Sequence, residues 1–269
     1  MKQFDPSKFT TSKPKPLPVL LVLDVSGSMN EVVDGSFTRT GQMVEEDGQT
    51  WEVVEGGVTR LQVLNQAVEE MIAALAKEEQ LEHEFLVSVI TFGEKVQLHL
   101  SPTRASSVSW ENLDAGGETP LGEAIATTKR LIEDKETTPS RAYRPVVVLV
   151  SDGKPTDQWK EQLASFVGTG RSTKCDRMAM AIGTGADEEM LQQFIAGTQN
   201  RLCHAADATQ VHEFFQRVTM SVTMRSTSRN PNEIPSEGDI KLGRHLAPAE
   251  EASKKSSKGA SSDDDEGYW

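Results

Sequence analysis

The sequence predicts an α/β fold, a doubly wound and mostly parallel six-stranded sheet with one antiparallel edge strand and helices on both faces. Two nearly unbroken apolar runs, residues 18–23 and 145–150, are typical of central parallel strands that are covered on both sides. The remaining elements mainly alternate strand-like runs with helical periodicity. Such an order implies parallel strands joined by right-handed crossovers.

The first half of the chain begins with a predicted strand at 18–25. A helix begins near Thr59 and repeats apolar residues at three-and-four spacing, which is the pattern of a helix that docks on a sheet. Two strand-like runs, 84–92 and 95–100, follow with only Gly93 and Glu94 between them. This spacing predicts a hairpin, and so the antiparallel edge strand.

Between the first strand and the first helix lies an insertion, residues 31–58. It alternates glycines with short β-favouring pieces and holds seven acidic residues against one basic residue, Arg39. We expect a β-hairpin or an ordered loop, because the chain must leave and return at the same end of the sheet. Its charge suggests the hypothesis that it selects a partner with a basic rim.

The second half continues the alternation. Pro120 suits the first turn of a helix, where its missing N–H is not needed. The predicted elements are a helix at 121–134, a strand at 144–151, a helix through Phe166, a strand at 177–182, a helix at 187–195, a short edge strand at 201–204 and a closing helix at 210–225.

The domain organisation follows from where these signals occur. They run without a linker over residues 17–225 of the 269, which predicts one domain with the insertion 31–58 inside it. Residues 1–16 form an N-terminal arm, and 226–269 read as a flexible acidic C-terminal tail. We find neither a signal peptide nor a run of about 20 apolar residues, so a cytoplasmic protein without a membrane partner is expected.

The charge and the metal-binding side chains exclude other classes. A formal charge of −13 argues against a nucleic-acid partner, since such binders need a concentrated basic face. The two cysteines form no C-x-x-C pair, and the five histidines have no spacing typical of a transition-metal site.

Three short fragments share one chemistry. Residues 24–28 (Asp-Val-Ser-Gly-Ser) and 151–153 (Ser-Asp-Gly) each follow a central strand, and 116–120 (Gly-Gly-Glu-Thr-Pro) precedes a helix. Ligands bind at the carboxyl ends of strands in open α/β sheets. Hydroxyl and carboxylate oxygens suit Mg²⁺ or Mn²⁺. The predicted metal ligands are Asp24, Ser26, Ser28, Thr119 and Asp152.

The donor set also predicts what the ion does. Hydroxyls are neutral, and we expect Asp24 and Asp152 to act mostly by orienting hydroxyls and waters, so the ion keeps much of its charge. Such an ion attracts an external carboxylate, which completes its coordination. We therefore predict no catalytic residue and a non-enzymatic module that binds an acidic residue of a partner protein.

These fragments resemble the metal-ion-dependent adhesion site, or MIDAS, of von Willebrand factor A (VWA) domains, whose fold is Rossmann-like. The resemblance covers about residues 17–225. Finer features, in residues 152–159, 180–183 and the closing helix, are similar to the bacterial TerY-type, tellurite-resistance branch. That resemblance implies an intracellular protein in a stress-response or defence system, with a Ser/Thr kinase and a PPM-type phosphatase as partners.

Other functions remain open. In a phosphotransfer enzyme of haloacid-dehalogenase type Asp24 would be the nucleophile, but position 26 is Ser where that chemistry needs a second carboxylate. A serine hydrolase would need a Gly-x-Ser-x-Gly elbow around Ser26 or Ser28. A third class is the VWA subunit of an ATPase or chelatase complex. This chain has no phosphate-binding loop, so nucleotide chemistry would belong to the partner.

Overall fold

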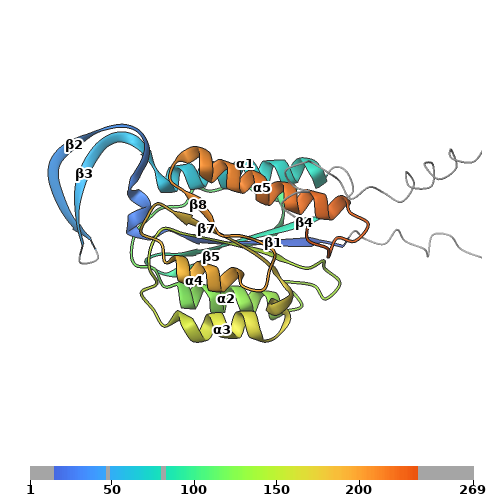
Figure 1. The fold of residues 1–269 in the computed structure, drawn as a ribbon. Coiled ribbons are helices and arrows are strands. Elements are labelled where there is room, and N and C mark those ends of the chain that lie inside the picture. Colours follow the sequence, from blue (N-terminus) through green and yellow to red (C-terminus); the bar gives the residue numbers. More distant parts are fainter. Residues whose placement is uncertain (1–14, 47–48, 80–82, 236–269) are drawn as a thin grey trace, which may run out of the picture.

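The predicted fold class is confirmed. The computed structural model describes residues 15–46, 49–79 and 83–235, and in these a six-stranded sheet carries helices on both faces (Figure 1). The strand order is β5-β4-β1-β6-β7-β8. The strands are β1 (Leu17–Asp24), β4 (Phe85–Phe92), β5 (Val96–Arg104), β6 (Val146–Ser151), β7 (Asp176–Ile182) and β8 (Cys203–Ala205).

β1 lies at the centre of the sheet because it is apolar on both sides. It pairs in parallel with β4 and with β6. Leu21 and Leu23 point to one core and Leu20 and Val22 to the other, and all four are buried. β5 runs antiparallel to β4 at the edge, as the two-residue spacing predicted.

Five helices cover the sheet. α1 (Arg60–Glu79) and α5 (Ala208–Thr227) lie on one face, and α2 (Leu121–Glu133), α3 (Trp159–Gly168) and α4 (Glu188–Ile195) lie on the other (Figure 1). Asp187 begins α4 by accepting a hydrogen bond from the Met190 backbone N–H at 3.0 Å, which satisfies a donor that the first helical turn leaves free. No helix in the described ranges is long and apolar enough to cross a membrane.

The insertion forms a β-hairpin, as predicted. β2 (Val32–Glu46) pairs antiparallel with β3 (Gln49–Thr59) in a sheet of its own. Figure 1 shows this hairpin arching away from the body at the end of the sheet where β1 stops. Its register shifts three times along the ladder, and such irregularities bend a ribbon.

The packed part of the chain extends past the predicted boundary at residue 225. α5 ends at Thr227, and the guanidinium of the buried Arg225 donates to the Pro231 carbonyl at 3.0 Å. The Arg144 backbone N–H donates to Asn232 Oδ1 at 2.8 Å. Residues 1–14 of the predicted arm and 236–269 of the predicted tail lie outside the described residues.

Candidate metal site

The three predicted fragments meet at the carboxyl ends of β1 and β6. The loop before α2 is tied to the loop after β1 by two backbone hydrogen bonds: the Gly27 N–H donates to the Gly117 carbonyl at 3.0 Å, and the Gly116 N–H donates to the Val25 carbonyl at 2.8 Å. Gly117 has a φ of 79°, and a Cβ there would lie 2.3 Å from the backbone of Glu94. Only glycine fits this close approach.

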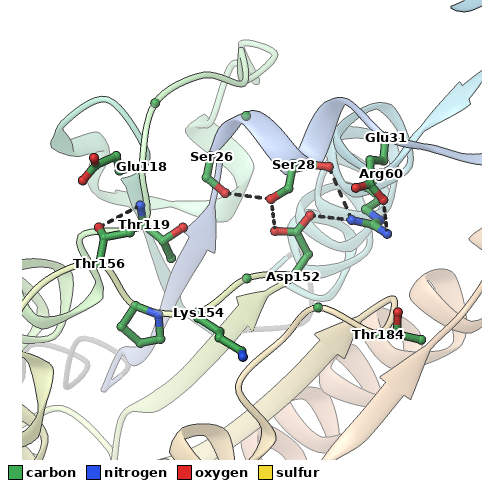
Figure 2. A pocket seen from close by; sticks show the side chains of 15 residues that line it. Ser26, Ser28, Glu31, Arg60, Glu118, Thr119, Asp152, Lys154, Thr156 and Thr184 are labelled. Carbon is green, nitrogen blue, oxygen red and sulfur yellow. Dashed lines mark hydrogen bonds and ion pairs between the residues drawn. The ribbon is translucent and has the colours of Figure 1, made fainter. Parts of the chain in front are cut away.

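Four of the five predicted ligands converge on one pocket (Figure 2). The hydroxyl oxygens of Ser26 and Ser28 lie 3.2 Å apart, and Ser28 donates to Asp152 Oδ1 at 2.7 Å. The Thr119 hydroxyl completes the group from the opposite loop. It lies 3.4 Å, and the Ser28 hydroxyl 4.0 Å, from the point that a Cβ on Gly153 would occupy. The two hydroxyls therefore approach the same point beside Gly153 from different loops.

Asp24, the fifth predicted ligand, lies behind this group. Its Oδ1 accepts from the Ser26 backbone N–H at 2.9 Å, and its Oδ2 accepts from the Ser151 hydroxyl at 2.6 Å. The side chain is fully buried and does not line the pocket. In this position it holds the backbone of Ser26 and the Ser151 hydroxyl in place.

The two carboxyl groups share one buried environment. Burial raises the pKa of Asp24 from its ordinary 3.8 to about 7, and the negative charge of Asp152 adds to this shift. Burial also raises the pKa of Asp152, although hydrogen bonds from Ser28 and the Arg60 guanidinium partly offset that shift. A divalent cation beside these two buried carboxyl groups would favour their ionised forms.

The donor set fits a small hard cation. Neighbouring ligands of an octahedral Mg²⁺ ion, each about 2.1 Å from it, lie about 3 Å apart. The oxygen separations of 3.2 Å and 2.7 Å at Ser28 are close to this spacing. The pocket is a cavity of about 530 Å³, so water or an external group has access to the ion. Ser26, Ser28 and Thr119 would hold Mg²⁺ or Mn²⁺, with Asp24 and Asp152 directing them.

The family model that matches the chain is described as von Willebrand factor type A domain. It matches residues 19–154, which is just over half of the chain and includes all five predicted ligands. The chain belongs to this family. The uncharacterized protein Rv2850c of Mycobacterium tuberculosis is 39% identical to this chain over 74 residues, which cover 26% of this chain and 12% of that protein.

Solved structures share the fold of this VWA domain at low sequence identity. A von Willebrand factor type A protein from Catenulispora acidiphila has a TM-score of 0.53 at 17% identity and covers 77% of this chain and 42% of its own. The ArnB paralog VWA2 from Sulfolobus acidocaldarius has a TM-score of 0.50 at 12% identity, covering 78% and 46%. An aspartate-to-alanine mutant of the PilB minor pilin from Streptococcus sanguinis has a TM-score of 0.50 at 14% identity, and the match covers 80% of this chain and 63% of the pilin chain.

Sequence reasoning missed Arg60, the first residue of α1. Its guanidinium donates to Asp152 Oδ2 at 2.9 Å and to the Ser28 carbonyl at 3.4 Å, and it pairs with Glu31 at 2.5 Å (Figure 2). The guanidinium packs on Gly183, where a Cβ would lie 2.6 Å from it. One signal was present in the sequence, because a cation is unfavourable in the first turn of a helix unless acidic groups face it.

A second missed residue is Asp157. Its carboxylate accepts from the backbone N–H groups of Gly122 at 2.8 Å and Glu123 at 2.9 Å, and so caps α2 from another loop. The Thr156 hydroxyl accepts from the Thr119 N–H at 3.2 Å, and the Thr156 N–H donates to the Thr119 carbonyl at 3.0 Å. The Thr119 loop is thus held by the segment that follows Asp152.

Proposed function

We propose that this VWA domain is a non-enzymatic protein-interaction module that uses Mg²⁺ or Mn²⁺ to bind a carboxylate of a partner protein. The observation that carries the proposal is the donor set. Three neutral hydroxyls and one edge of Asp152 line a pocket that is open to solvent. An ion held in this way keeps coordination positions and charge available for an external anion.

The charges near the site support this proposal. Asp24 and Asp152 together match the charge of a divalent ion, but Asp152 is also paired with Arg60. Arg60 therefore neutralises part of the Asp152 charge, which leaves less negative charge to balance the ion. Glu31 neutralises part of the Arg60 charge, but its side chain is 42% exposed and solvent screens this effect. A partner carboxylate would compensate the charge that remains on the ion.

The enzyme alternatives have less support. A nucleophilic Asp24 would need a free oxygen facing substrate, but both of its oxygens accept hydrogen bonds and the side chain is fully buried. Ser26, two residues on, cannot act as the carboxylic acid or base of that mechanism. In an ATPase or chelatase complex the domain would act as the same metal-dependent module, with the nucleotide chemistry in the partner.

The cellular role is a second part of the proposal. The TerY-type features in residues 152–159 and 180–183 favour a cytoplasmic stress-response, tellurite-resistance or defence system, in which an associated Ser/Thr kinase and a PPM-type phosphatase are candidate partners. This part rests on resemblance alone.

A pull-down from the native cell tests the metal-dependent interaction. Proteins captured by the wild-type chain in MgCl₂ should be lost in EDTA and lost to Asp24→Ala and Thr119→Val. Thr128→Val is the matched control, because Thr128 is a buried threonine on α2 that bonds only to the Ala124 carbonyl, at 2.8 Å. A captured protein that is retained equally in EDTA and by Thr119→Val would contradict the proposal.

A further inference from the structure

The hairpin encloses a second pocket beside the metal site. This hairpin groove is a cavity of about 570 Å³, lined by apolar side chains from both strands and by an ion pair between Arg39 and Glu52. Phe37 and Val44 are 46% and 42% exposed although they line it. Large apolar side chains gathered on one exposed element mark interaction surfaces rather than core.

The hairpin groove and the metal pocket are adjacent. Both are lined by Gly27 and by Glu31. Glu31 also joins them mechanically: its carbonyl accepts from the Arg60 N–H at 3.0 Å and its carboxylate pairs with the Arg60 guanidinium, which in turn bonds Asp152. The base of the hairpin is therefore held at the metal site, and a ligand on the ion lies next to the groove.

We propose that the hairpin groove binds a large apolar side chain that lies next to the metal-binding acidic residue in a segment of the partner protein. The inference rests on the proposed function, which supplies the metal-bound acidic residue. It adds that the residue beside this acid is large and apolar. The ion would supply the affinity for any carboxylate. The groove would distinguish one acidic segment from another.

Proximity and charge favour a partner segment over other occupants. The groove shares Gly27 and Glu31 with the pocket where the partner carboxylate is proposed to bind, so one segment could contact both. The hairpin carries acidic residues in excess, and its Glu52 is already paired with Arg39 at 2.6 Å. A second copy of this acidic chain would bring like charges together at that surface. A segment with an acid, an apolar residue and flanking basic residues would complement it.

The geometry of the hairpin also leaves the groove without a cover from its own body. In the described residues the hairpin forms a sheet with no third strand, and a two-stranded ribbon alone has little stability. Gly57, with a φ of 78°, allows its strand to pass Val32 closely, since a Cβ there would lie 2.5 Å from the Val32 side chain.

A random peptide library displayed on phage is the probe that tests the inference. The full chain is used for selection in MgCl₂ with elution by acid, in parallel with the double variant Phe37→Ser, Val44→Ser and with Met43→Ser. Met43 is the matched control, because it is 58% exposed on the same strand but does not line the groove. The wild type and Met43→Ser should enrich an acidic residue beside a large apolar one.

The groove variant should still enrich the acid but lose the apolar preference, and a selected peptide should bind it about tenfold more weakly in fluorescence anisotropy. The inference would be overturned if the wild type enriched an acid without an apolar neighbour. It would also be overturned if the groove variant kept the preference for an apolar neighbour. A dimer of the wild type in light scattering that the groove variant abolishes would also overturn it. Peptides that carry no acid, or bind equally in EDTA, would instead refute the proposed function.

Discussion

Two arginine–carboxylate pairs, one at the end of the central sheet and one in the hairpin, show how differently the two regions are built. Arg60 is 13% exposed and its partner Asp152 is fully buried, and the guanidinium also bonds a carbonyl and Glu31. Arg39 is 72% exposed and its partner Glu52 is 26% exposed, and within the described residues that guanidinium makes no other bond. The first pair is held by several contacts, and the second is held by one.

The two regions differ in how firmly their side chains are positioned. The predicted metal ligands lie on loops tied to buried strands and to one another, so their spacing is set by the sheet. The hairpin is attached at its base through Glu31 and Arg60 and otherwise extends away from the body (Figure 1). Side chains that need a fixed spacing lie at the end of the sheet, and the surface proposed to select the partner lies on the hairpin.

The largest contrast should come from removing each arginine. Arg60→Ala leaves the buried Asp152 without its cation, so we expect the metal-free domain to lose about 3 kcal/mol of unfolding free energy. Arg39→Ala removes an exposed pair and should cost less than about 1 kcal/mol. Urea unfolding in EDTA measures both decreases in unfolding free energy. Equal decreases would show that the two arginine–carboxylate pairs do not differ in this way.

A second effect should come from the pH dependence of the sheet end. The raised pKa of Asp24, about 7, means that between about pH 4 and pH 7 the folded metal-free protein holds a proton that the unfolded chain has released. The free energy of unfolding therefore falls as pH rises through this window, by at most about 1.4 kcal/mol for each pH unit. Asp152 shifts in the same direction.

Asp24→Asn removes the titrating group with little change of shape. In EDTA the unfolding free energy of the variant should depend less on pH, and near pH 8 the variant should be more stable than the wild type. The variant should also lose the ability to bind Mg²⁺. Chemical unfolding at about pH 5 and pH 8 in EDTA gives the comparison. The raised pKa of Asp24 would be refuted if the unfolding free energy of the wild type rose from pH 5 to pH 8 and Asp24→Asn abolished that rise.

Magnesium itself should stabilise the sheet end. At an Mg²⁺ concentration tenfold above the dissociation constant, the unfolding free energy should rise by about 1.4 kcal/mol. Thr119→Val, which removes only a hydroxyl ligand, should abolish most of this gain, and Thr128→Val should keep it. Thermal unfolding with and without MgCl₂ measures the gain. A full gain in Thr119→Val would remove that hydroxyl from the site.

The smallest effect should come from the hairpin. Deleting residues 34–56 and closing the gap with a short glycine linker leaves Glu31, Arg60 and all five predicted ligands in place. Magnesium affinity should change by less than about twofold, while binding of the captured partner is lost. Isothermal titration with MgCl₂ and a repeat of the pull-down separate the two. Undiminished capture of the partner would show that the hairpin has no part in recognition.

Much of the fold was predictable because its signals are local. The unbroken apolar run at 18–23 follows from burial on both faces, and the short connection at Gly93 predicts the antiparallel edge. The meeting of the three fragments was predictable because loops converge where parallel strands end.

The rest depends on contacts between distant residues. Arg60 reaches Asp152 only because α1 begins beside β6, and Asp157 caps α2 across 35 positions of sequence. The contacts of residues 228–235 with the domain depend on Arg144 and Arg225, whose partners no local pattern reveals. The hairpin groove arises from register shifts in β2 and β3, which alternation alone does not predict.

A crystal grown in MnCl₂ tests the central claim most directly. The account predicts an anomalous peak bonded to the hydroxyls of Ser26 and Ser28, with Thr119 or its water completing the site, Asp24 outside direct contact, and one position taken by water or an external carboxylate. A peak elsewhere would contradict the account. So would a map with no ion at this site, in which the hydroxyls of Ser26 and Ser28 remain hydrogen-bonded to each other.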